Sequence, residues 1–317
     1  MTLKQVFIAP DGRLRPGLRA LLFLPTFAAL LAAVIFSLRP FLRGAVPQEL
    51  GEVRLLVQSL VLVPLTALAA WILLRLADRC SFRNLGLWFY DGGGKELGLG
   101  LAGGALMNSV VVGATAAFGG TEFHLRDVEP MVLARGLLWA AGILIPAATF
   151  EELLFRGYPF QRLVESWGAL IPVVAISGLF GLAHARNPNA TAFTIANTVL
   201  AGIWLAQAYL KTRALWYPIG LHFSWNFIMG FVYSLPVSGI VLSNQLLTTK
   251  DHGPQWLTGG DYGPEGSILC TGVLVVAIVW QARTGFLKVT PAMAAELAQP
   301  GATPSGEVEW KPADPAP

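Results

Sequence analysis

Long apolar segments alternate with short polar connections along almost the whole chain. Eight of them stand out, at residues 20–38, 55–74, 97–118, 131–155, 169–184, 193–210, 214–233 and 267–280. A helix needs about 20 apolar residues to cross the hydrocarbon core of a membrane, and most of these segments approach that length. The pattern therefore predicts an all-α fold, a polytopic bundle of about eight transmembrane helices.

The polar stretches between these segments suggest how the chain is organised. We expect a cytoplasmic N-terminal segment (1–19), a first group of transmembrane helices (20–130), a helical core (131–233), a long loop with the last transmembrane helix (234–283), and a tail rich in Pro and Ala (284–317). The tail has few large apolar residues to bury, so we expect it to be disordered.

Composition narrows the class of protein further. Of the 317 residues, 54% are hydrophobic and only 13% are charged, against roughly a quarter charged in an ordinary soluble protein. The mean hydropathy is +0.58. The net charge of +3 is too small to indicate nucleic-acid binding. Two cysteines, Cys80 and Cys270, are too few and too far apart for a disulfide framework, and we expect each to be a small buried side chain.

The basic residues predict the orientation in the membrane. With the N-terminus inside, 15 Lys and Arg residues fall on the inner side and 6 on the outer side, leaving Arg135 within a span. Lys and Arg concentrate on the cytoplasmic side of membrane proteins. We therefore expect an integral protein of the cell membrane with both termini in the cytoplasm.

Several ionisable residues interrupt the apolar segments of the second half. Each such residue costs roughly 2.5–3.5 kcal/mol at the centre of a membrane helix, so it usually marks a function. The residues concerned are Glu151, Glu152, Arg156, His184, His222 and, as a polar neighbour, Asn226.

Helical spacing separates these residues into roles. Glu152 and Arg156 lie four residues apart on one helix face, which predicts a supporting ion pair. Neighbouring side chains point about 100° apart, so Glu151 faces elsewhere and remains free for chemistry. His222 and Asn226 are also four residues apart, so we expect both to face one cavity.

Helix lengths predict that Glu151 and His184 meet. If the fourth helix continues through residues 156–165 to a turn at 166–168, Glu151 lies 16 residues before Trp167 and His184 lies 17 after it. In an antiparallel hairpin the two side chains would then be level.

A carboxylate, two imidazoles and a carboxamide form a hydrolytic set. Glu151 can act as general base towards water, and His184 can orient that water. His222 and Asn226 can donate hydrogen bonds to an oxyanion. Alternatively, a divalent metal such as zinc could be held by Glu151, His184 and His222. Neither a His-Glu-x-x-His nor a Gly-x-Ser-x-Gly motif is present.

The motifs also carry a family resemblance. Glu-Glu-x-x-x-Arg at 151–156, Phe-x-x-x-His at 180–184 and His-x-x-x-Asn at 222–226 occur in that order. Together they resemble the CPBP family, which includes CAAX prenyl endopeptidases and bacteriocin-processing and abortive-infection-type proteins. The resemblance implies an all-helical intramembrane protease with Glu151, His184, His222 and Asn226 as functional residues, and leaves its dependence on metal open.

The function expected from these arguments is an intramembrane endopeptidase of the CAAX-protease type. It would cleave near the C-terminus of a prenylated or otherwise membrane-associated peptide or protein. Two rivals remain: a non-catalytic membrane scaffold on the same fold, and a proton-coupled transporter that uses the same residues as a relay. The sequence does not indicate an oligomeric state.

Overall fold

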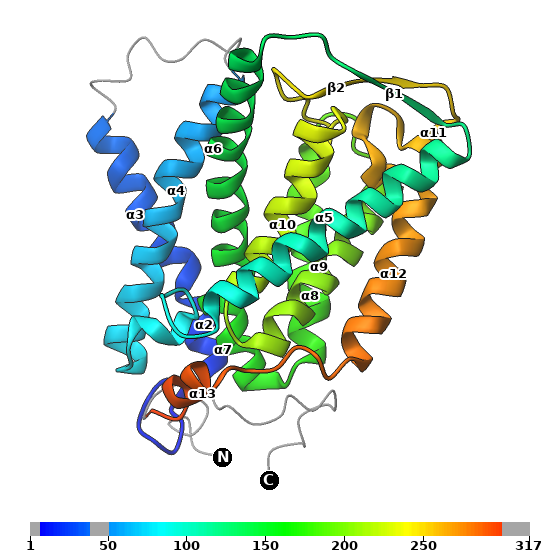
Figure 1. Ribbon diagram of the computed structural model, residues 1–317. Helices are drawn as coiled ribbons and strands as arrows, with labels where there is room; N and C mark the ends of the chain where they lie inside the picture. Colours follow the sequence, from blue (N-terminus) through cyan, green and yellow to red (C-terminus); the bar gives the residue numbers. More distant parts are fainter. Residues whose placement is uncertain (1–6, 39–50, 300–317) are drawn as a thin grey trace.

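Each of the eight predicted spans coincides with one or two helices of the computed structural model, which describes residues 7–38 and 51–299 (Figure 1). Within that part of the chain, five helical segments are long and apolar enough to cross a membrane, and two shorter apolar helices accompany them. The helices are α2 (Pro16–Leu21), α3 (Phe23–Leu38), α4 (Gly51–Leu73), α5 (Gly93–Ala117), α6 (Pro130–Phe155), α8 (Leu170–Ala183), α9 (Ala192–Thr212), α10 (Trp216–Phe227) and α12 (Ile268–Arg283). The prediction of a helical membrane bundle is confirmed.

Shorter elements complete the bundle. Two π-helical turns extend the ends of α4 and α10, and α7 follows α6. An antiparallel pair of strands, which the all-α prediction did not include, joins the loop before α6 to the long loop before α12. Their bounds are η1 (Leu74–Asp78), η4 (Ile228–Val232), α7 (Tyr158–Trp167), β1 (Thr121–Leu125), β2 (Leu247–Asp251), η2 (Phe82–Leu85), η3 (His184–Arg186), α11 (Gln255–Thr258), η5 (Gly260–Tyr262), η6 (Pro264–Gly266) and α13 (Pro291–Leu297).

The bundle has two distinct ends. In Figure 1, α2, α7 and α13, close to the first and last described residues, lie at one end, whereas β1, β2 and the long loop lie at the opposite end. We call these the termini face and the ribbon face. Helices α6, α9 and α12 run from the ribbon face to the termini face, and α8 and α10 run the other way.

The fourth span and the amphipathic segment after it form two helices, and not the continuous helix on which the level placement of Glu151 and His184 was based. Arg156 and Gly157 separate α6 from α7. Pro159, in the first turn of α7, has no N–H for a continuing helix. A Cβ on Gly157 would lie 2.1 Å from the Leu153 carbonyl oxygen, so the bend requires glycine. The predicted turn is confirmed at Gly168, whose φ is 70°.

The first residues of the tail are folded, contrary to the expectation of disorder from residue 284. Thr290 caps α13, and Met293 and Leu297 are buried in a cluster with Ala214. Met293 and Leu297 are four positions apart and therefore lie on one face of α13, which packs against Ala214 at the termini face. Residues 300–317 lie outside the described residues, and the remaining domain boundaries stay a prediction.

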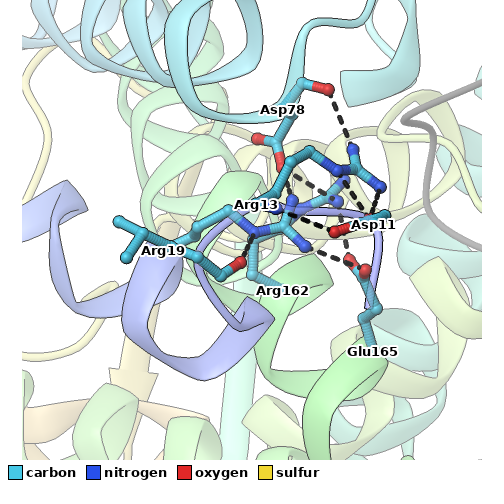
Figure 2. Close-up of polar contacts among 7 residues, drawn as sticks. Asp11, Arg13, Arg19, Asp78, Arg162 and Glu165 are labelled. Carbon is cyan, nitrogen blue, oxygen red and sulfur yellow. Dashed lines mark hydrogen bonds and ion pairs between the residues drawn. The ribbon is translucent and has the colours of Figure 1, made fainter. Parts of the chain in front are cut away.

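A buried network of charges holds the termini face together (Figure 2). Arg19 of α2 pairs with Asp78 of η1 and with Glu165 of α7, at 3.0 Å for the second pair. Arg162 of α7 lies 3.4 Å from Asp78 and 2.6 Å from Glu165. Arg19, Asp78 and Arg162 are fully buried, and buried charges are tolerated when they are paired. The network therefore fixes α7, which follows α6 directly, against the first and second spans.

Helix α5 approaches α10 so closely that only glycine fits between them. A Cβ on Gly100 would lie 2.4 Å from the Tyr217 carbonyl oxygen, and one on Gly104 would lie 2.2 Å from that of Leu221. Small residues four apart let membrane helices pack backbone to backbone. This contact sets the position of α10, which carries His222 and Asn226.

Replacing Gly104 with Ala should therefore destabilise the protein. Inserting a methyl group into a packed contact costs about 1–3 kcal/mol, and we expect a lower melting temperature in detergent. Gly113→Ala on the same helix is the matched control, because a Cβ there meets no atom within 4 Å. It should be neutral or stabilising by up to about 1 kcal/mol, since Ala favours a helix over Gly. Equal melting temperatures for the two variants would contradict the close contact.

Candidate active site

The predicted functional residues line one cavity within the bundle. Its volume is about 340 Å³, and its walls include Glu151, His184, His222 and Asn226. Apolar and aromatic side chains form most of the remaining wall, among them Phe155, Phe180, Trp204, Trp225, Leu205 and Leu274. Helices α4, α6, α8, α9, α10 and α12 thus contribute to a single site.

Glu151 stands between the two histidines. Its Oε2 atom lies 3.8 Å from Nε2 of His184 and 3.8 Å from Nε2 of His222. Within the described part of the chain this buried oxygen has no hydrogen-bond partner. A separation of 3.8 Å is too long for a direct hydrogen bond but suits one water bound to both atoms at about 2.8 Å. The predicted meeting of Glu151 with both imidazoles is therefore present in the structure.

Phe180 orients His184, a role that sequence reasoning missed. The His184 Nδ1–H donates to the Phe180 carbonyl oxygen at 2.8 Å, so in the neutral ring Nε2 carries the lone pair that faces Glu151. The two rings also pack, with centroids 4.7 Å apart. The same Phe180 ring contacts the Arg156 guanidinium at 4.5 Å and the His222 ring at 6.1 Å. The Phe180 ring thus contacts three polar residues of the site, His184, His222 and Arg156.

Glu152 does more than pair with Arg156. Its Oε1 accepts a hydrogen bond from Arg156 Nη1 at 3.0 Å, as the spacing predicts, and a second one from His222 Nδ1 at 2.8 Å. Arg156 Nη2 also donates to the Gly202 carbonyl oxygen of α9 at 3.1 Å. The side chains of Glu152 and Arg156 are fully buried. Glu152 therefore orients His222 so that its Nε2 faces Glu151.

The long loop supplies a carboxylate that the sequence motifs do not include. Glu265 lines the same cavity, and its two oxygens accept from Trp225 Nε1 at 3.2 Å and from Ser238 N and Oγ at 2.8 and 2.6 Å. Trp225 precedes Asn226 on α10. These bonds fasten both ends of the 234–266 loop to the helix that carries the site. Only distant positions in the sequence are involved, so helical spacing could not reveal them.

Glu151, His184 and His222 are the candidate ligands for a metal ion. Tetrahedral ligands bound at about 2.1 Å lie roughly 3.4 Å apart, whereas Glu151 Oε2 is 3.8 Å from each imidazole nitrogen. In residues 7–38 and 51–299, no group of three His, Cys, Asp or Glu side chains is arranged to hold a metal ion. As placed, Glu151 and the two imidazoles lie farther apart than three ligands that share one ion.

The segment that carries the site matches a known protein family. Residues 133–228 match the family model described as Type II CAAX prenyl endopeptidase Rce1-like. The matched segment contains all six polar residues that the motifs single out, and it confirms the resemblance to the CPBP family over that segment. No curated protein and no solved structure matches the chain at a significant level. The match points to a membrane-embedded endopeptidase.

Replacing Glu152 with Gln should reduce turnover even though Glu151 is untouched. His222 then loses the carboxylate that orients it. Loss of one oxyanion donor typically lowers kcat by about 10²–10³-fold. We expect a fall of that order with little change in KM, measured by cleavage of a quenched peptide in detergent.

Two further variants make this test decisive. Glu165→Gln is the matched control: Glu165 also pairs with arginines, but on the termini face, so kcat should stay at the wild-type value. If Glu152→Gln fails to fold because Arg156 is left unpaired, the double variant Glu152→Gln/Arg156→Gln removes the unpaired charge. Wild-type kcat in either folded Glu152 variant would show that His222 needs no carboxylate.

Proposed function

We propose that this protein is an intramembrane endopeptidase that hydrolyses a peptide bond with water activated by Glu151. The observation that carries this proposal is the unpartnered Oε2 of Glu151, 3.8 Å from both imidazole nitrogens in a cavity that Asn226 also lines. A non-catalytic scaffold would not need a carboxylate, two imidazoles and a carboxamide around one cavity.

The first step forms the tetrahedral intermediate. A water bound between Glu151 Oε2 and His184 Nε2 transfers one proton to Glu151 while its oxygen attacks the peptide carbonyl carbon. The carbonyl oxygen becomes an oxyanion, which the Asn226 carboxamide can stabilise as a donor. His222 Nε2 can donate as well when the ring carries both protons, a form that the Glu152 carboxylate stabilises through Nδ1.

The second step breaks the C–N bond. The oxyanion collapses to a carboxylic acid, and Glu151 returns its proton to the departing amine. Glu151 thereby regains the form that activates the next water. His184 holds its tautomer throughout, because the Phe180 carbonyl oxygen accepts only from a protonated Nδ1.

The proposal extends to the kind of substrate and to the membrane in which the protein lies. The chain is an integral membrane protein, so the substrate is a peptide or protein that reaches the bilayer. We infer a segment near the C-terminus of a prenylated or otherwise membrane-associated protein. We place the protein in the cell membrane with both termini in the cytoplasm, as the distribution of Lys and Arg favours.

Replacing Glu151 with Gln should abolish cleavage without unfolding the protein. Removal of a positioned general base typically costs about 10²–10⁴-fold in rate. Wild-type and variant proteins would be purified in detergent, matched by melting temperature, and assayed with quenched peptides, including a prenylated C-terminal one. Glu122→Gln is the control, since Glu122 is an exposed carboxylate of β1. Equal cleavage by wild type and Glu151→Gln would remove Glu151 from the mechanism.

Chelation gives an independent test of the metal alternative. Because Glu151 and the two imidazoles are too far apart to share one ion as placed, we expect cleavage to continue at the wild-type rate after dialysis against EDTA. The measurement is kcat/KM before and after dialysis. A loss of activity that zinc restores would show that the residues move together around a metal.

A further inference from the structure

Asn226, the proposed oxyanion donor, depends on its backbone for its direction. Its carboxamide is half-buried in the cavity wall and makes no hydrogen bond to any residue that the structure describes. Asn226 is also the second-last residue of α10, where the α-helix passes into the π-helical turn η4. Helix ends fray, and the hydrogen-bonding pattern changes at such a junction. The orientation of Asn226 therefore depends on what holds the last turn of α10.

The neighbouring Trp225 ties this last turn to the long loop. Its Nε1–H donates to Glu265 Oε1 at 3.2 Å, and its ring packs edge-on against Trp204 of α9, with centroids 5.9 Å apart. The Trp225 side chain is buried. Because a hydrogen bond is directional, the last turn of α10 cannot rotate about the helix axis without weakening the bond to Glu265.

Glu265 is itself a fixed acceptor. Its Oε2 accepts from N and Oγ of Ser238 at 2.8 and 2.6 Å, and its backbone carbonyl oxygen accepts from Asn197 Nδ2 of α9 at 2.8 Å. Asn197 also donates to the Ser267 carbonyl oxygen at 3.1 Å, at the residue that caps α12. The Glu265 carboxylate is therefore held between the start of the loop, α9 and the beginning of α12.

We propose that Glu265 is a positioning residue of the active site, which acts through Trp225 to direct the Asn226 carboxamide towards the oxyanion. This inference rests on the proposed endopeptidase function. Glu265 lies outside the matched segment 133–228. The long loop is thus a working part of the site, in addition to the helices that carry the motifs.

Glu265→Gln breaks the bond to Trp225 selectively. A carboxamide has one acceptor oxygen and one donor nitrogen, where a carboxylate has two acceptor oxygens. Ser238 offers two donors and Trp225 offers one, so the Gln oxygen should face Ser238. The Gln Nε2 group then faces the indole N–H, from which it cannot accept. The side chain keeps its size, so packing is unchanged.

The kinetic test is a double-mutant cycle in detergent with a quenched peptide. Glu265→Gln should lower kcat by about 10–10²-fold with little change in KM, since misplacing a group by about 1 Å slows catalysis to this extent. Asn226→Ala should cost about 10²–10³-fold. In the Asn226→Ala protein, Glu265→Gln should cost nothing more, because no carboxamide is left to position.

Asp261→Asn is the matched control, because Asp261 is an exposed carboxylate of the same loop, and it should keep the wild-type kcat. Additive losses from Glu265→Gln and Asn226→Ala would overturn the proposal. A change of charge in the cavity, or a general loss of stability, would slow the Asn226→Ala protein as well. A wild-type kcat in Glu265→Gln would also overturn it.

Amide hydrogen exchange tests the same contact without cleavage. Glu265→Gln should speed exchange at residues 224–229, the end of α10, whereas Asp261→Asn should leave it at the wild-type rate. Unchanged exchange in Glu265→Gln would show that α10 is held without Glu265, against the proposal. If solubilised wild-type protein cleaved no peptide, the endopeptidase function would fail, and the exchange rates would still decide whether Glu265 holds the end of α10.

Discussion

The site depends on one buried carboxylate that has two partners. Glu152 Oε1 binds Arg156 at the end of α6 and His222 on α10, and Arg156 in turn donates to the Gly202 carbonyl oxygen on α9. A charge in the middle of an apolar bundle is costly unless it is paired and hydrogen-bonded. Displacing α9 or α10 would break one of these bonds and leave a buried charge with fewer partners. The electrostatic requirement of Glu152 therefore aligns three helices, and that alignment is what brings both imidazoles to Glu151.

Contacts outside the site also hold α10 in position. The backbone contact of Gly100 and Gly104 with α10 fixes that helix from one side, and Glu265 fastens Trp225 of α10 to the long loop from the other. Neither contact includes a reacting group. Helices whose backbones are in close contact cannot slide past one another by small amounts, because a densely packed interface does not deform continuously. Asn226 and His222 are therefore presented to the cavity by a helix that is constrained on both sides.

Much of the fold and of the site could be predicted from the sequence, because distances along a helix follow from the number of residues. The eight spans, the turn at Gly168 and the meeting of Glu151 with His184 all follow from apolar length and rise per residue. The break at Gly157 was missed because an amphipathic continuation has the same periodicity as a separate helix. The bond from Glu152 to His222 and the roles of Phe180 and Glu265 join residues on different helices or on a loop. Their pairing depends on how helices rotate against one another, which spacing within one helix does not determine.

The two adjacent glutamates show how position on a helix separates chemistry from support. Glu151 and Glu152 are identical side chains one residue apart, so a turn of about 100° is the main difference in how they are presented. That rotation directs Glu152 into the bundle, where its side chain is fully buried, and Glu151 towards the cavity, where 26% of the side chain is exposed. Glu152 Oε1 is bound by an arginine and an imidazole inside the bundle, whereas Glu151 faces the cavity, where a water can reach its carboxylate. One carboxylate thus supports the site through Arg156 and His222, while its neighbour in the sequence is presented to the cavity.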